Sequence, residues 1–221
     1  MNRNIVITGA NRGIGLALAA HYKNNNDNVY AICRKSGEAL TNLGVTVIDG
    51  IDVSDPVTVA NLASALHDTP IDILINNAGI WNSSVLRHID YDKTVELFNV
   101  NALAPLRVTE SLLGNLGSGS KIALITSRMG SICDNSSGSS YDYRMSKAAL
   151  NAAGKSLAVD LKEEGIAVAI LHPGFVQTDM VGGHGDISAD VSAERLVQRI
   201  EELNIGNSGT FWHSNGEVLP W

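Results

Sequence analysis

Tyr143 and Lys147 are the residues whose types and spacing point most directly to chemistry. Side chains four positions apart lie on one face of a helix, so the phenol and the ammonium are expected to converge. A tyrosine that gives its proton to a carbonyl oxygen must survive as a phenolate, and lowering its pKa from about 10 to near neutrality requires about 3–4 kcal/mol. We expect Lys147 to lower the pKa of Tyr143. A solvated helix face is the alternative. Tyr141 lacks such a partner, because Met145 stands four residues on.

A second pattern is a glycine-rich turn between a short apolar run at 4–8 and a helical pattern at 14–22. Gly9, Gly13 and Gly15 occupy this turn. Positions without Cβ let the backbone turn tightly and approach a phosphate, and the start of the following helix offers N–H groups and partial positive charge. The turn predicts binding of a dinucleotide pyrophosphate, and a tight turn without a ligand is the alternative.

The elements that must position these residues follow from the spacing of apolar residues. Short β-branched runs predict strands at 4–8, 28–33, 45–48, 71–75, 121–126, 167–171 and 209–213. Spacings near three and four predict helices at 14–22, 57–66, 94–113, 145–161 and 193–203. Alternating strands and helices require crossover connections, which predicts a doubly wound, mostly parallel seven-stranded α/β sheet with helices on both faces, a Rossmann-like fold. We expect one domain over 1–221, with a dinucleotide-binding half at about 1–120 and a catalytic and substrate half at about 121–221.

The glycine spacing also carries a family resemblance. G-x-x-x-G-x-G differs from the usual G-x-G-x-x-G pattern and resembles the TGxxxGIG motif of the short-chain dehydrogenase/reductase family. Further motifs similar to the family's follow in order along nearly the whole chain. They are Asn76-Asn77-Ala78-Gly79, Asn101, Ser127, the YxxxK pattern of Tyr143 and Lys147, Pro173-Gly174 and Thr178. The resemblance implies an NAD(P)-dependent oxidoreductase.

The resemblance implies four catalytic residues, namely Ser127, Tyr143, Lys147 and Asn101. Tyr143 would be the general acid in reduction and the general base in oxidation, and Lys147 would also bind the ribose hydroxyls. Ser127 would hydrogen-bond the substrate oxygen, where negative charge builds as hydride arrives. The resemblance alone gives Asn101 the task of holding a water in a proton relay.

The cofactor preference is predicted from the end of the second strand, where NAD enzymes of this fold place an acidic residue for the ribose 2′-hydroxyl. Neutral Cys33 stands there, Arg34 follows it, and Arg12 lies in the glycine turn. Because arginines bind phosphate, NADP(H) is expected over NAD(H), and two solvated arginines are the alternative. The expected cofactor-binding set, partly implied by the resemblance, is Gly9, Asn11, Arg12, Gly13, Ile14, Gly15, Arg34, Asp52, Val53, Asn77, Ala78, Gly79, Tyr143, Lys147, Pro173, Gly174, Val176 and Thr178.

A closer resemblance concerns the substrate half. The short length, the run at 171–180 and the ending at 209–221 are similar to the carbonyl reductases grouped with sniffer and the C-factor proteins. Glycines at 182, 183 and 185 predict a small, flexible lid over an open pocket with a broad substrate range. Expected substrate contacts are Ser127, Met129, Tyr143, Phe175 and Met180.

The function expected from these features is NADPH-dependent reduction of a small-molecule carbonyl substrate, an aldehyde, ketone or quinone. An NADP-linked dehydrogenase of hydroxylated lipids or steroids would run the same chemistry in reverse. A dinucleotide-binding signalling or sensor protein with little turnover is the alternative outside enzymes. Intact Ser127, Tyr143 and Lys147 argue against it, because a sensor needs no acid.

Composition restricts the remaining classes. The chain of 221 residues is 44% hydrophobic and 18% charged, which is typical of a globular protein. Its net charge of −7 disfavours nucleic acid, and no run approaches the roughly 18 apolar residues of a membrane span. Cys33 and Cys133 form no paired motif, which fits a reducing, cytoplasmic compartment, and scattered histidines predict no metal site. The family resemblance implies a homodimer or homotetramer through the helices at 94–113 and 143–161.

Overall fold

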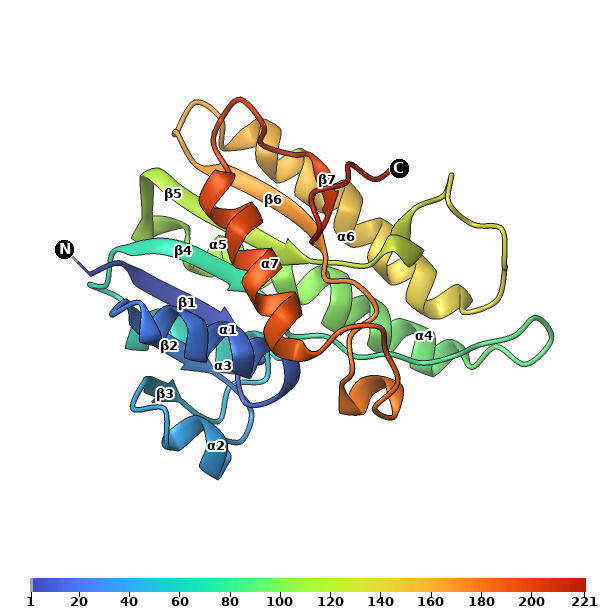
Figure 1. Cartoon of the computed structure of the whole chain (residues 1–221), viewed down its shortest axis with the longest axis horizontal. Helices are drawn as coiled ribbons and strands as arrows, with labels where there is room; N and C mark the ends of the chain where they lie inside the picture. The colour runs from blue at the N-terminus through green and yellow to red at the C-terminus, as the bar shows by residue number, and fades with distance from the viewer. Residues whose placement is uncertain (1) are drawn as a thin grey trace.

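The computed structural model describes residues 2–221 and has a seven-stranded sheet at its centre (Figure 1). Every neighbouring pair of strands is parallel, in the order β3-β2-β1-β4-β5-β6-β7. The strands are β1 (Asn4–Thr8), β2 (Asn28–Ile32), β3 (Thr46–Ile48), β4 (Ile71–Asn76), β5 (Leu116–Ile125), β6 (Ala167–His172) and β7 (Phe211–His213). The doubly wound α/β fold and the seven strands predicted from the sequence are confirmed, and β5 begins five residues before its predicted start at 121.

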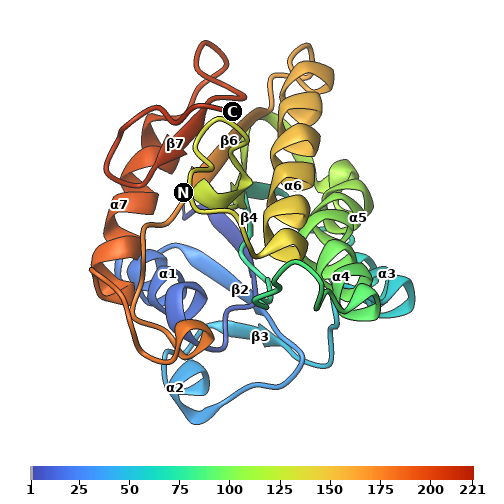
Figure 2. The same ribbon diagram turned by 90° about the vertical axis from the view of Figure 1, so that its right-hand side faces the viewer.

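Helices cover both faces of the sheet (Figures 1 and 2). One face carries α1 (Gly13–Asn24) and α7 (Ala189–Glu202), which pack against each other. The other carries α3 (Pro56–Ala65), α5 (Ala104–Ser111) and α6 (Tyr141–Asp160), with α4 (Tyr91–Phe98) beside α6. The remaining helical turns are α2 (Glu38–Thr41), η1 (Asn99–Leu103), η2 (Leu113–Asn115), η3 (Arg128–Gly130) and η4 (Asp179–Val181). None of the helices in residues 2–221 has the length and apolar character needed to cross a membrane.

The two cores show why the central strands are mainly apolar. Successive side chains of a strand point to opposite faces, so a strand covered on both faces is buried at every position. In β1, Ile5 and Ile7 pack in the same core as Leu18 of α1, while Val6 packs in the other core with Leu62 of α3. The sheet is therefore held rigidly between its helices, and its carboxyl edge is a fixed platform for a site.

The helix predicted over 94–113 is confirmed as helical chain at 91–111, but it is not one uniform α-helix. The chain instead forms α4, a π-helical segment at η1 and then α5. Pro105 lies at the start of α5 and has no N–H to donate, so the α-helical ladder cannot run unbroken through this region. Widened turns of this kind occur often at functional sites, and this one contains Asn101. The four-residue α2 was not predicted, because one turn is too short to show a period.

Strand order places a crevice at one edge of the sheet. From β1 the chain first adds β2 and β3 on one side, and it later adds β4 to β7 on the other. The connections after β1 and β4 therefore leave in opposite directions, and ligands of such folds bind between them at the carboxyl edge. Gly9 follows β1 and Asn77 follows β4, so the sequence motifs sit at this point.

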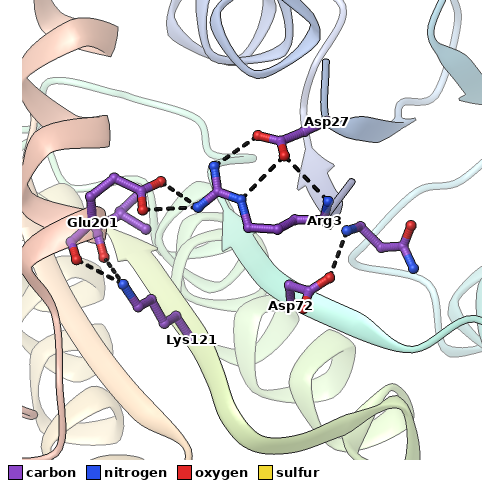
Figure 3. A network of polar contacts seen from close by, with 7 residues as sticks. Arg3, Asp27, Asp72, Lys121 and Glu201 are labelled. Atoms are coloured by element: carbon purple, nitrogen blue, oxygen red, sulfur yellow. Dashed lines mark hydrogen bonds and ion pairs between the residues drawn. The ribbon is translucent and has the colours of Figure 1, made fainter. Parts of the chain in front are cut away.

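The opposite edge of the sheet is tied by an ionic network (Figure 3). The Arg3 guanidinium donates to the carboxylate of Asp27 at 2.8 Å and to that of Glu201 at 2.7 Å. The Lys121 ammonium donates to the backbone carbonyls of Ile200 and Glu201 at 2.8 and 2.9 Å. These contacts join the starts of β1 and β2 to the carboxyl end of α7, far from the crevice, so they stabilise the frame and not the site.

Candidate active site

The glycine turn after β1 is shaped by close contact with the chain that follows β4. Gly9 has φ +65°, a left-handed conformation that favours glycine, and a Cβ there would lie 2.9 Å from the Ala78 Cα. A Cβ on Gly15 would overlap the Gly9 carbonyl oxygen and lie 2.6 Å from Asn77 Nδ2. Glycine is required at both positions, for different reasons: the turn at Gly9 and helix packing at Gly15.

Hydrogen bonds join the ends of β1 and β4 at this crossing. The Thr8 hydroxyl oxygen accepts from the backbone N–H groups of Asn77 and Ala78 at 3.0 and 3.1 Å. In return, Asn77 Nδ2 donates to the carbonyls of Thr8 and Gly9 at 3.0 and 3.1 Å. The Asn-Asn-Ala-Gly motif therefore holds the glycine turn in place.

The start of α1 is suited to an anion. Arg12 is its N-cap residue, and no side chain in residues 2–221 accepts a hydrogen bond there as a cap. The first-turn N–H groups and the positive end of the helix dipole therefore remain available to a ligand. Gly13 and Ile14 of this turn line a cavity of about 510 Å3. These features fit the pyrophosphate of a dinucleotide.

This first cavity, which we call the cofactor cavity, contains most of the predicted cofactor residues. They are Gly9, Asn11, Arg12, Gly13, Ile14, Arg34, Asp52, Val53, Asn77, Ala78, Gly79, Tyr143, Lys147, Pro173 and Thr178. Gly15, Gly174 and Val176 do not line it. Cys33, which the sequence placed at the ribose end of the cofactor site, lines it as well. Sequence reasoning missed other lining residues, among them Ile51 and Ser54. Ile51 follows β3 closely, and its place at the carboxyl edge was the signal that could have identified it.

A second cavity of about 510 Å3, which we call the substrate cavity, adjoins the first. It is lined by all five predicted substrate residues, Ser127, Met129, Tyr143, Phe175 and Met180. Gly174 and Val176 lie here, and so do Trp81, Arg128, Arg144 and His172, which sequence reasoning did not assign to a site. The residues common to both cavities are Ile14, Thr126, Tyr143, Pro173, Thr178 and Met180. The cavities therefore meet at Tyr143.

The first turns of α6 bring Tyr143 and Lys147 together as the spacing predicts. Lys147 is buried, its Nζ donates to the Ile125 carbonyl at 3.0 Å, and it lies 5.8 Å from the centre of the Tyr143 ring. Burial lowers the pKa of Lys147 to about 8. Burial also raises the pKa of Tyr143 to about 12, although the nearby Ser127 hydroxyl acts in the opposite direction.

This differs from the expectation that Lys147 brings the pKa of Tyr143 down. Desolvation of the phenolate is the larger effect in the chain by itself. Tyr143 consequently keeps its proton at neutral pH. A protonated phenol at the junction of the cavities can act as a proton donor to a bound molecule.

Ser127 follows β5 and caps the short η3 helix. Its Oγ accepts from the Met129 N–H at 3.2 Å, and the side chain is buried. A hydroxyl that accepts one hydrogen bond still has its own proton to donate. Ser127 can therefore donate to an oxygen placed beside Tyr143.

Asn101, in the π-helical segment, connects the loop after β4 to α6. Its Oδ1 accepts from the Ile80 N–H at 2.9 Å, and its Nδ2 donates to the Ile80 carbonyl at 2.9 Å and to Ser146 Oγ at 3.0 Å. Ser146 Oγ in turn donates to the Tyr143 carbonyl at 2.8 Å. Asn101 lines neither cavity, and it positions the loop at Ile80 and Ser146 of α6. Its water-holding role stays a prediction.

Asp142 is a positioning residue that the sequence did not reveal. Its buried carboxylate accepts from Asn82 Nδ2 at 2.6 Å, from Ser84 Oγ at 2.8 Å and from the Tyr143 N–H at 2.8 Å. These bonds attach the first turn of α6 to the loop after β4. They set the direction from which Tyr143 enters the cavities.

The two arginines expected at a 2′-phosphate line the cofactor cavity and are loosely paired. Arg12 lies 3.6 Å from Asp179, and Arg34 lies 4.0 Å from Asp52, with both guanidinium groups exposed. The hydroxyl and the N–H of Ser54 both donate hydrogen bonds to Asp52 Oδ1, and these bonds hold the pKa of Asp52 below its usual value. Both arginines are therefore free to turn toward an anionic ligand.

His172 lies at the end of β6 in the substrate cavity. Burial lowers its pKa to about 3, so it is neutral, and it meets His213 edge-on with ring centres 4.8 Å apart. In residues 2–221, no group of three or more His, Cys, Asp or Glu side chains is arranged to hold a metal ion.

Comparisons with known proteins agree with this geometry. The family model described as short chain dehydrogenase matches residues 3–202. A 1-hydroxy-2-glutathionyl-2-methyl-3-butene dehydrogenase of Rhodococcus sp. strain AD45 is 35% identical, covering 98% of this chain and 99% of that protein. The C-signal protein of Myxococcus xanthus is 45% identical over 69% of this chain and 93% of its own length.

Solved structures are similar over the whole chain. The NADPH-bound carbonyl reductase from chicken fatty liver has a TM-score of 0.90 at 30% identity, covering 100% of this chain and 99% of that one. The carbonyl reductase Sniffer of D. melanogaster has a TM-score of 0.91 at 30% identity, covering 100% of both. The predicted resemblance to the sniffer and C-factor group is confirmed by Sniffer and the C-signal protein.

The glycine turn gives a prediction for cofactor binding. Gly9→Ala combines a left-handed backbone with a contact of 2.9 Å to the Ala78 backbone, so we expect NADPH to bind at least about 10-fold more weakly. Gly44→Ala is the matched control, because Gly44 has φ +63° but open space around it. Nicotinamide fluorescence titration measures both. Equal affinity in the two variants would contradict the role of the turn.

Proposed function

The chain belongs to the short chain dehydrogenase family and is an NAD(P)-dependent oxidoreductase, and on that premise we propose that it reduces carbonyl compounds with NADPH. The observation that carries the proposal is the junction of the two cavities at Tyr143, with Ser127 and Lys147 beside it. We assign cofactor binding mainly to residues 1–120, and catalysis and substrate binding mainly to 121–221.

In the proposed reaction, Tyr143 gives its phenolic proton to the carbonyl oxygen. When bound, the reduced nicotinamide supplies the hydride that the carbonyl carbon accepts. Ser127 donates a hydrogen bond to the same oxygen and stabilises the negative charge that builds on it. The Lys147 ammonium stabilises the phenolate that Tyr143 leaves, and it would also hold the ribose hydroxyls. Asn101 keeps Tyr143 and the loop at Ile80 in register.

The preference for NADPH is supported by charge. Arg12 and Arg34 line the cofactor cavity, and each forms only a weak ion pair, with Asp179 and Asp52. Cys33 stands where an NAD enzyme of this fold would have an acidic residue. A charge-assisted hydrogen bond contributes about 1.5–3 kcal/mol, which corresponds to about 10- to 100-fold in preference for each arginine. An NADPH-bound structural neighbour is consistent with this reading.

Alcohol oxidation is the second candidate, because the Rhodococcus relative at 35% identity is named as a dehydrogenase of a hydroxylated compound. Oxidation needs Tyr143 as phenolate, whereas its pKa of about 12 favours the phenol. The protonated phenol is the state that reduction uses, and this supports the reductase proposal. A sensor with little turnover would need Tyr143 neither as phenol nor as phenolate.

The proposal extends to the protein's setting. We propose a homodimer or homotetramer in the cytoplasm that acts on small molecules and not on nucleic acid. The support is an acidic chain with a net charge of −7 and exposed apolar side chains along α4, η1 and α6, including Tyr91, Val95, Leu103 and Val159. The short segment after η4, which contains glycines at 182, 183 and 185, supports a broad substrate range.

The proposed chemistry is tested by turnover. NADPH consumption with a panel of aldehydes, ketones and quinones should be detectable, and Tyr143→Phe should lower kcat/KM by about 100- to 10,000-fold because the proton donor is lost. Tyr141→Phe, on the same helix and partly exposed, is the control and should retain activity. Cofactor binding without carbonyl turnover would contradict the reductase assignment and favour alcohol oxidation first and the sensor second.

The cofactor preference is tested by charge reversal. Arg34→Glu should replace attraction for a 2′-phosphate by repulsion and shift the NADPH to NADH ratio of kcat/KM toward NADH by at least about 10-fold. Lys23→Glu makes the same change of charge on α1 and should leave the ratio as it was. An unchanged ratio in Arg34→Glu is the result that would rule out this assignment.

A further inference from the structure

Two arginines line the substrate cavity, and their surroundings differ. The charge of Arg128 is already compensated, because its Nε lies 2.6 Å from the Asp134 carboxylate and its Nη2 lies 3.3 Å from that of Glu217. Arg128 and Asp134 both line the cavity. This cluster therefore presents little net positive charge to a substrate.

Arg144 has no such partner. Among residues 2–221, no carboxylate lies within ion-pair distance of its guanidinium. The carboxylate of Asp142, two positions away in the chain, is occupied by Asn82 and Ser84. Arg144 is half-buried as a residue and lines the cavity, and two of the three hydrogen bonds of its guanidinium lie at the exposed surface. An anion bound there would meet a cation that no carboxylate of residues 2–221 compensates.

The guanidinium of Arg144 is oriented by neutral groups. Nε donates to the Gly138 carbonyl at 3.3 Å, Nη1 to the Met129 carbonyl at 3.4 Å and Nη2 to Ser137 Oγ at 2.8 Å. These bonds hold the group between η3 and the loop at 131–140. Each Nη carries a second N–H that these bonds do not use. The side chain is thus held in place with donors left for a ligand.

The rest of the cavity is largely apolar, with walls from Trp81, Phe175, Val176 and Met180. Arg144 directly follows Tyr143 on α6, so the cation and the proton donor reach the cavity from one helical turn. A molecule bound here would meet a proton donor, an apolar wall and an uncompensated cation together.

We propose that Arg144 recognises a carboxylate on the substrate, so that the preferred substrates are carbonyl compounds with an apolar body and a carboxylate beyond it. This proposal rests on the proposed carbonyl reduction and names its substrate class. Arg144 acts on binding and orientation, and Tyr143 remains the proton donor.

The first test compares 4-carboxybenzaldehyde with its neutral methyl ester. The ratio of kcat/KM for the acid over the ester, taken in each protein form, cancels the intrinsic reactivity of the two aldehydes when forms are compared. Arg144→Gln should lower this ratio by about 10- to 100-fold, the effect of one charge-assisted contact. Arg144→Lys keeps the cation and should lower it less. Equal losses in both variants would point to a displaced loop and overturn the proposal.

Two further variants show which cation matters. Lys23→Gln removes a charge outside both cavities and should leave the ratio unchanged. Arg128→Gln combined with Asp134→Asn removes a compensated pair from the same cavity without changing its net charge, and should change the ratio less than Arg144→Gln does. A larger loss in this double variant than in Arg144→Gln would overturn the assignment to Arg144.

A binding measurement separates this proposal from the reductase assignment. Benzoate and benzamide are titrated by calorimetry into the protein–NADP+ complex, where neither can react. Preference for benzoate in the unsubstituted protein, lost in Arg144→Gln, supports the anion site even if no aldehyde is turned over, in which case only the reductase assignment fails. No preference for benzoate, or a preference that survives in Arg144→Gln, overturns the anion site.

Discussion

A buried ammonium is the constraint on which the arrangement of the site depends. Lys147 lies on the buried side of α6, its Nζ donates to the Ile125 carbonyl, and burial lowers its pKa to about 8. This contact ties α6 to the end of β5. Asp142 holds the first turn of that helix from the loop after β4, and Asn101 holds Ser146 from the π-helical segment. The same contacts aim Tyr143 at the junction of the two cavities.

The same neighbourhood explains why the two halves of the chain form one site. The chain after β4 supports the glycine turn through Asn77 and reaches Asn101 through Ile80. One loop thus connects the place suited to a pyrophosphate with the place suited to proton transfer. In the proposed reaction, this loop sets the distance between the hydride donor and the proton donor. Reacting groups must hold such a distance to within a fraction of an ångström.

Periodic features of the sequence predicted the fold well, because the seven strands and their covering helices each leave a local pattern. The π-helical segment within the helix predicted at 94–113 was missed because the apolar spacing continues through a backbone that Pro105 forces to widen. Gly174 and Val176 were placed with the cofactor on family resemblance, and their contact with it stays a prediction, because they line the second cavity and not the first. Motif position alone does not tell which cavity a side of a loop faces. Asp142 was missed because a buried carboxylate and a solvated one look alike in sequence. The pKa of Tyr143 depends on tertiary burial and could not be obtained from the spacing to Lys147.

The pH dependence of carbonyl reduction tests the central claim most directly, namely that a protonated Tyr143 works beside a buried Lys147 whose ammonium loses its proton at a lowered pKa. Because burial lowers its pKa, Lys147 carries its charge below pH about 8 and loses it above, while Tyr143 stays protonated throughout. We predict that kcat/KM at saturating NADPH is level near neutrality and falls as the pH rises past about 8. A profile that stays level until about pH 10, where an unperturbed lysine titrates, would contradict the account.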